Sequence, residues 1–157
     1  MGFLGKMKAK KLLKQAVAMQ DSGNIGEAGR LFREAINADP GFWETHLHYG
    51  YFLQENGQIA DAEREFREAI RLNPGSDEAY SGLGSVLHAL GRYREAVEAF
   101  KKAVENNPSN ITAWINLGTC QIESGDFPGA MNTFREALKH TNDPEMIQYI
   151  KQQLGEA

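Results

Sequence analysis

The chain of 157 residues is long enough for one compact domain or one short repeat array, and its apolar content is ordinary for a folded protein. The single cysteine excludes an intramolecular disulfide framework. The sequence contains no run of 18 apolar residues, so it predicts no membrane-spanning helix. The net charge of −4 combines five lysines and no acid in residues 1–20 with 12 basic and 21 acidic residues in the remainder. This acidic body argues against general nucleic-acid binding, which needs a basic face.

Residues 1–8 are expected to form a basic N-terminal extension of the first helix. Phe3, Leu4 and Met7 beside the lysines could form an amphipathic helix that touches an anionic membrane. We favour a solvated helix start over membrane contact, because Leu12 and the residues after it belong to the repeat pattern described next. The lysines also interrupt the apolar stretch that a signal peptide needs, and we expect a cytoplasmic protein.

Six sets of residues recur along the chain with an interval of 34 residues, which indicates a repeat protein. The sets are Gly23, Gly57, Gly91 and Gly125; Ala28, Ala62, Ala96 and Ala130; Phe32, Phe66, Phe100 and Phe134; Ala35, Ala69, Ala103 and Ala137; Pro40, Pro74 and Pro108; and Gly50, Gly84 and Gly118.

Each unit contains two helical patterns separated by a short turn. In the third unit, apolar residues at helical spacing occupy residues 80–87 and again residues 96–104, with Gly91 between them. The glycine is a typical helix stop, and Ser76, Asn110 and Asp126 are candidate N-caps of the helices that follow them. The glycine set at residues 50, 84 and 118 is expected to let helix backbones approach closely, with the phenylalanines filling the space between successive units.

The fourth unit carries Trp114, Leu117 and Gly118, followed by Ala130 and Phe134. This order resembles the signature of the tetratricopeptide repeat (TPR) family, Trp-x2-Leu-Gly-x2-Tyr followed by Ala-x3-Phe. The sequence departs from the signature at Gln121, where the family has tyrosine.

Four such repeats cover about residues 9–42, 43–76, 77–110 and 111–142, within a single array over residues 1–157. The resemblance implies an all-α fold, a right-handed α-solenoid (superhelix) of antiparallel helix pairs.

Residues 143–157 are predicted to form a terminal helix and tail. Asp143 and Pro144 are suited to the N-cap and the first turn, and an apolar stripe follows. The stripe consists of Met146, Ile147, Ile150 and Leu154. We favour a helix that caps the last repeat, with a docking helix for a second subunit as the alternative.

No motif for catalysis, phosphate binding or dinucleotide binding occurs, so we expect no enzyme and no cofactor. His46 and His48 point away from each other on a helix, and no histidine has a cysteine or carboxylate at metal-ligand spacing along the chain. Cys120 shares its place in the repeat with Phe52 and Val86, which predicts a small buried hydrophobic residue. We therefore expect no metal site.

The resemblance to the TPR family further implies a concave groove, lined by the first helix of each repeat, that holds a peptide or a helix of a partner. The candidate groove residues are Leu13, Val17, Leu47, Tyr51, Glu55, Ser81, Ser85, His88, Ile115, Asn116, Thr119 and Ile122. The lysine and asparagine clamp of co-chaperone TPR domains is absent, since Leu13, Val17 and His48 occupy the matching positions. Whether Leu47 and Ile115 are exposed in the groove or pack against neighbouring first helices stays open.

The predicted function is that of a non-catalytic adaptor or scaffold for protein–protein interaction. Its partner would offer a segment with aliphatic and some basic character, because acidic residues flank the apolar groove positions. One alternative is a TPR module that self-assembles into homo-oligomers through its terminal helices. Another is an accessory subunit that presents substrate to an enzyme complex.

Overall fold

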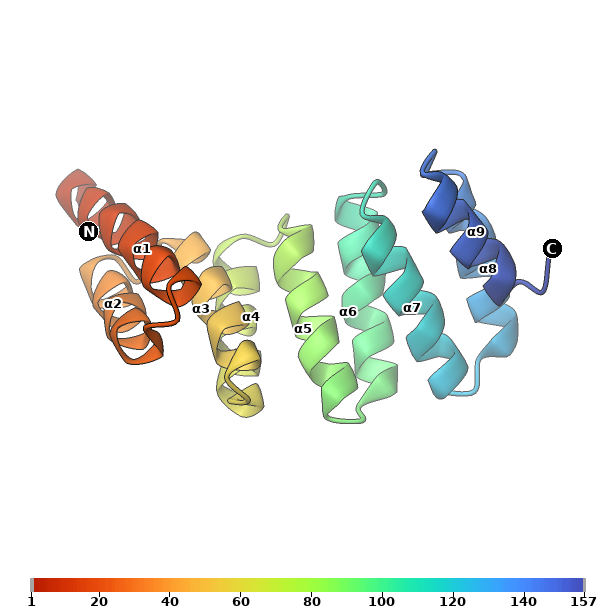
Figure 1. Cartoon of the computed structure of the whole chain (residues 1–157), viewed down its shortest axis with the longest axis horizontal. Coiled ribbons are helices and arrows are strands. Elements are labelled where there is room, and N and C mark those ends of the chain that lie inside the picture. The colour runs from red at the N-terminus through yellow and green to blue at the C-terminus, as the bar shows by residue number, and fades with distance from the viewer. Residues whose placement is uncertain (1, 157) are drawn as a thin grey trace. The chain divides into compact units, whose positions relative to one another are not determined.

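The computed structural model describes residues 2–156, and every regular element in this span is an α-helix. The chain divides into two compact units, Met1–Gly75 and Ser76–Ala157, and each is described by itself. The first unit contains α1 (Phe3–Asp21), α2 (Ile25–Ala38), α3 (Trp43–Glu55) and α4 (Ile59–Leu72). The second contains α5 (Asp77–Ala89), α6 (Tyr93–Asn106), α7 (Ile111–Glu123), α8 (Phe127–Leu138) and α9 (Pro144–Gln153) (Figure 1).

Short turns join the two helices of each pair, so the helices pack antiparallel, as predicted (Figure 1). The turn glycines have positive φ angles, 78° at Gly23, 76° at Gly57, 72° at Gly91 and 88° at Gly125, a conformation that glycine adopts without a Cβ penalty. The all-α class and the pairing of helices are thus confirmed. The single array over residues 1–157 and its repeat boundaries stay predictions.

Side-chain caps fix several helix starts where the sequence predicts them. Ser76 Oγ accepts a hydrogen bond from the backbone N–H of Ala79 at 3.1 Å, and the Asn110 side chain accepts from Ala113 at 3.0 Å. Asp126 and Asp143 cap α8 and α9 in the same way. Each cap satisfies one of the N–H groups that the first helical turn leaves without a partner.

The recurring phenylalanines form the centre of each helix pair. Phe32, Phe66, Phe100 and Phe134 are at most 1% exposed. In three of the pairs the ring lies directly over a glycine of the preceding helix. A Cβ atom added to that glycine would lie only 2.6–2.8 Å from the nearest ring atom. The glycines therefore make room for an aromatic ring of their own repeat. The close approach expected at these glycines is thus that of a backbone to a ring, whereas the expectation that phenylalanines fill the space between units holds for Phe32, which contacts α3.

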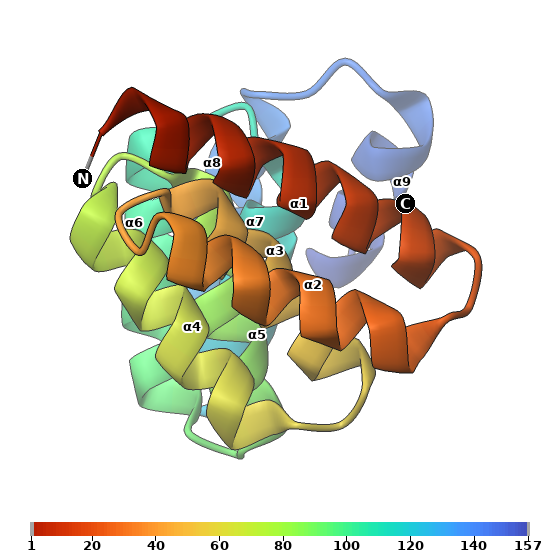
Figure 2. The same cartoon turned by 90° about the vertical axis from the view of Figure 1, so that its left-hand side faces the viewer.

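In the first unit α1 lies along α2 and also contacts α3 (Figure 2). Phe32 of α2 packs against Tyr49 and Phe52 of α3, with ring centroids 5.4 and 5.2 Å away. The helix begins at Phe3 and so includes residues 3–8, while their role as a basic extension of a repeat array stays a prediction. Phe3 and Leu4 are nearly 80% exposed at this end.

In the second unit α6 packs on α7, α7 on α8, and α8 on α9. Ile150 of α9 is fully buried against Ala130, Phe134 and Ala137 of α8. This contact buries one face of α9 against α8, and the capping role of residues 143–157 stays a prediction.

Candidate functional site

The predicted groove residues lie on α1, α3, α5 and α7, and they differ in how far solvent reaches them. Leu13 is 9% exposed and Leu47 only 2%, so both serve mainly to pack helices together. For Leu47, the structure thus shows the packed alternative. Glu55 is exposed, and the remaining nine candidates are half-buried.

Within the first unit, the accessible candidates are Val17, Tyr51 and Glu55. The Tyr51 ring packs edge-on against Phe66, with centroids 4.9 Å apart, so this tyrosine is held in place by the core of its own repeat. Gln20 Nε2 of α1 donates a hydrogen bond to Glu55 Oε2 of α3 at 2.6 Å. This bond ties together the C-terminal ends of two successive first helices.

Within the second unit, four candidates from two helices line one pocket. Ser85 and His88 come from α5, and Asn116 and Thr119 come from α7; Phe100 and Cys120 complete the lining. The pocket has a volume of about 80 Å³, which is enough for several water molecules or the tip of a side chain.

The two isoleucine candidates of α7 face a different environment. Ile115 and Ile122 are half-buried and pack against the buried cluster formed by α8 and α9. Ile115 thus combines the two possibilities that the sequence left open, since it packs against its neighbours and keeps some exposed surface. Ser81 is half-buried on α5, and its Oγ lies 3.5 Å from the amide nitrogen of Asn110.

A cluster that sequence reasoning missed lies beside this pocket. His88 of α5 and Cys120 and Glu123 of α7 each place one ligand atom within 4.8 Å of the other two. His88 Nε2 and Glu123 Oε2 are 2.7 Å apart. Spacing along the chain gave no sign of this cluster, because its members are up to 35 residues apart and meet only where α5 packs on α7.

The prediction that Cys120 is buried is confirmed, as it is 1% exposed. Burial, and secondarily the nearby charge of Glu123, raise the pKa of its thiol to about 11. A thiol in this state is a weak nucleophile, because the thiolate is the reactive form.

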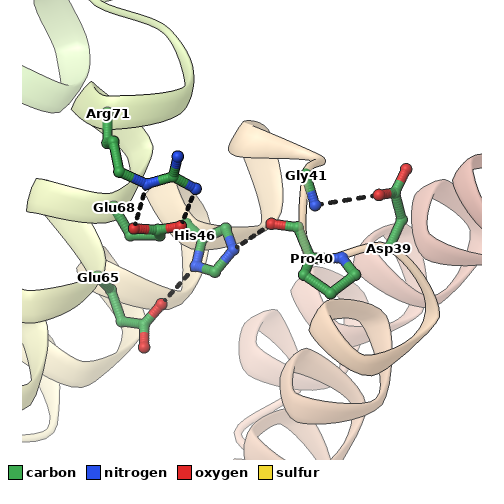
Figure 3. Close-up of polar contacts among 7 residues, drawn as sticks. All are labelled: Asp39, Pro40, Gly41, His46, Glu65, Glu68 and Arg71. Carbon is green, nitrogen blue, oxygen red and sulfur yellow. Dashed lines mark hydrogen bonds and ion pairs between the residues drawn. The ribbon is translucent and has the colours of Figure 1, made fainter. Parts of the chain in front are cut away.

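A second polar network lies in the first unit around His46 (Figure 3). His46 Nδ1 is 2.7 Å from Glu65 Oε2, and its Nε2 is 3.0 Å from the carbonyl oxygen of Pro40. The neighbouring Glu68 accepts two hydrogen bonds from Arg71, at 2.9 and 2.6 Å. Although burial lowers the pKa of His46, the bonds to Glu65 and Pro40 outweigh it, and the pKa lies above its usual value.

The His46 contact has a counterpart two repeats later. Trp114 Nε1 donates to the carbonyl oxygen of Pro108 at 2.8 Å, with the same separation of six residues along the chain. His46 therefore stands where the signature has tryptophan, and its first role is to tie a helix to the preceding turn. We assign this network a structural role.

Helix pairs that repeat every 34 residues, with a ring over a glycine in three of them, define a helical-repeat protein. Three models of the tetratricopeptide repeat family match, at residues 31–64, 50–111 and 87–154. The chain therefore belongs to the tetratricopeptide repeat family.

Solved structures with the same fold agree with this assignment. A crystal structure of MamA is 24% identical, with a TM-score of 0.81 over 89% of this chain and 80% of that one. PilF of Pseudomonas aeruginosa is 19% identical, with a TM-score of 0.81 over 96% and 69% of the two chains. The first TPR domain of Spaghetti (RPAP3), solved with an HSP90 peptide, is 23% identical, with a TM-score of 0.74 over 76% and 95%. No curated protein matches the sequence.

Among the described residues, no helix combines the length and apolar character that crossing a membrane requires.

Proposed function

We propose that this protein is a non-catalytic adaptor that binds a segment of a partner protein on the face formed by α5 and α7. The observation that carries the proposal is the shared pocket, in which Ser85 and His88 of one helix meet Asn116 and Thr119 of the next. These residues supply hydrogen-bond donors and acceptors around a small hollow, and such polar groups fix the orientation of a bound ligand.

The surroundings of the pocket indicate the chemistry of the partner. Ile122 offers half-buried apolar surface on α7, and Glu123 is a partly exposed carboxylate at the end of the same helix. Acidic residues outnumber basic ones in the chain as a whole. A segment with aliphatic anchors and a basic residue would therefore bury apolar area and complement the charge.

Structural similarity supports the class of ligand. The RPAP3 domain that shares this fold was solved with a peptide, so helix pairs of this kind can hold a peptide ligand. A cytoplasmic location belongs to the same proposal.

The test uses two matched arginine substitutions in the full chain. Asn116→Arg fills the pocket, whereas Asn132→Arg adds the same side chain to the exposed surface of α8. Partners captured by the wild type are identified by mass spectrometry, and the binding segment is then titrated against each purified variant.

We expect Asn116→Arg to weaken binding of that segment by at least tenfold and Asn132→Arg to bind like the wild type. Thermal melts followed by circular dichroism check that both variants fold. Equal binding by both variants would show that the α5–α7 face is not the site.

Self-association is the second candidate, and one observation favours it. Phe3, Leu4 and Met7 are 78%, 79% and 54% exposed at the start of α1. Large exposed apolar side chains of this kind are typical of interaction surfaces. Light scattering over a concentration series, with wild type and a Phe3→Ser, Leu4→Ser variant, separates the two candidates, because only a self-associating chain shows a mass that rises with concentration and falls in the variant.

A further inference from the structure

We propose that His88, Cys120 and Glu123 form a binding site for a Zn²⁺ ion, a property that goes beyond the binding of a protein partner although the site shares His88 with the pocket proposed for that partner. The three side chains come from two helices of one compact unit, and their ligand atoms all lie within 4.8 Å of one another.

The geometry is close to that of a bound ion. A tetrahedral Zn²⁺ with typical bond lengths places its ligand atoms roughly 3.3–3.7 Å from one another. His88 Nε2 and Glu123 Oε2 are 2.7 Å apart, so they need to separate by less than about 1 Å, which small side-chain rotations achieve. Because Cys120 and Glu123 are three residues apart on α7, they face the same side of that helix.

The donor set is suited to zinc more than to other common ions. One imidazole nitrogen, one thiolate sulfur and one carboxylate oxygen are all ligands that Zn²⁺ accepts, whereas Mg²⁺ and Ca²⁺ prefer oxygen alone. A thiolate and a carboxylate together carry two negative charges, so the complex with a neutral imidazole has no net charge. This neutrality lowers the cost of placing the ion where Cys120 is buried.

A comparison within the chain shows that the ligands are an addition to the packing of this fold. Gln20 and Glu55 of the first unit occupy the same repeat positions as His88 and Glu123, and they make the same contact at 2.6 Å. In the first unit, Phe52 occupies the repeat position that Cys120 occupies in the second. A glutamine therefore suffices for the hydrogen bond between the two helices. At the equivalent place in the second unit, the glutamate lies beside an imidazole and a thiol, which are both metal-binding groups.

The site is accessible and has room for a fourth ligand. The side chains of His88 and Glu123 are 42% and 35% exposed, which leaves an entry path for the ion. His88 and Cys120 also line the pocket of about 80 Å³, where a water molecule can complete the tetrahedron. Three protein ligands with one open position are the arrangement of a zinc site that exchanges its fourth ligand.

Binding releases one proton for each ion. The Cys120 sulfur binds Zn²⁺ as a thiolate, so the S–H bond breaks, the Zn–S bond forms and the proton passes to solvent. The hydrogen bond from His88 Nε2 to Glu123 is replaced by the Zn–N and Zn–O bonds, and the neutral imidazole keeps its proton on Nδ1.

The test is a metal titration of the full-length, tag-free and reduced protein. Co²⁺ is added first, because a cobalt–thiolate bond gives a charge-transfer band in the near ultraviolet, and Zn²⁺ then displaces it. A competing chromophoric chelator gives the affinity for Zn²⁺. The variants are His88→Gln and Cys120→Val. Each introduces the residue type found at the same position of another repeat, where Gln20 corresponds to His88 and Val86 to Cys120. The matched control is His48→Gln, which removes an exposed histidine of α3.

We expect one Co²⁺ per chain with a charge-transfer band in the wild type and in His48→Gln. The band should disappear in Cys120→Val, and His88→Gln should weaken Zn²⁺ binding by at least about tenfold. The absence of the band in the wild type would overturn the proposal, as would unchanged affinity in His88→Gln.

Discussion

A Cβ atom built on Gly84 would lie 2.7 Å from Cε2 of Phe100, on the paired helix of the same repeat. Real Cβ atoms do not approach an aromatic carbon this closely, and the ring cannot move away because Phe100 is 1% exposed. A Cβ atom built on Gly50 would lie 2.8 Å from the nearest ring carbon of Phe66, and one on Gly118 would lie 2.6 Å from that of Phe134. The absence of a side chain at this one glycine position thus sets how closely the two helices of a repeat fit together.

The first prediction concerns this contact. Gly84→Ala should destabilise the protein by about 1–3 kcal/mol, because overpacking outweighs the better helix propensity of alanine. Equilibrium unfolding in urea measures the change. The control is Gly26→Ala on α2, where an added Cβ meets nothing within 4 Å and should leave stability equal or slightly higher. Similar results for the two variants would contradict the packing explanation.

The second prediction separates backbone conformation from packing. A Cβ on Gly91 meets nothing within 4 Å, but the residue has a φ of 72°. Gly91→Ala should therefore cost about 1–2 kcal/mol through conformation alone. Gly91→Asn should cost clearly less, because asparagine tolerates the left-handed region better. Urea unfolding of both variants tests this order, and an alanine variant as stable as the asparagine variant would refute it.

The third prediction concerns pH. Because the pKa of folded His46 is raised above the unfolded value of 6.5, its charged form stabilises the folded state. This stabilisation is fully present below the unfolded pKa, and it is lost as the pH rises through the folded pKa. The free energy of unfolding of the wild type, relative to His46→Gln, should therefore be largest below pH 6.5 and decrease as the pH rises above it.

Urea unfolding at several pH values measures this dependence. His48→Gln is the control, because it makes the same exchange at an exposed histidine of the same helix and leaves the bonds of His46 to Glu65 and Pro40 in place. A constant difference between wild type and His46→Gln across the range would show that the imidazole does not act through its charge.

The fourth prediction concerns a buried hydrogen bond in the second unit. Thr133 Oγ1 donates to Gln121 Oε1 at 2.6 Å, and both residues are at most 7% exposed. Thr133→Val removes the donor and leaves a buried acceptor without it, at a cost of about 1–3 kcal/mol. Adding Gln121→Leu should recover most of this loss, because leucine occupies the equivalent positions 53 and 87.

A double-mutant cycle in urea gives the coupling between the two residues. A double variant less stable than Thr133→Val alone would show that Gln121 contributes by something other than this bond.

Much of the fold follows from the sequence because its causes are local. Gly91 stops a helix through its own φ, and Ser76 caps one through a bond to a residue three positions away. Both effects depend on a few neighbouring residues, and a period of 34 repeats them along the chain. The departure at Gln121 was also visible in the sequence, but its partner Thr133 was not, since that bond joins two helices.

The candidate site was predictable only in part. Ser85, His88, Asn116 and Thr119 follow from repeat positions, and they do line one pocket. Leu47 occupies an equally good groove position but is 2% exposed, because exposure depends on what packs against a residue and not on its register.

The sequence by itself determined the family, the helix pairs and the turns, since these depend on residue types at fixed intervals. Only the tertiary structure decided which side chains meet. The contact between His88 and Glu123 spans 35 residues, one more than the repeat, and exists because α7 packs beside α5. Packing between helices is thus what brings the imidazole of His88 to a thiol and a carboxylate that lie on one face of α7.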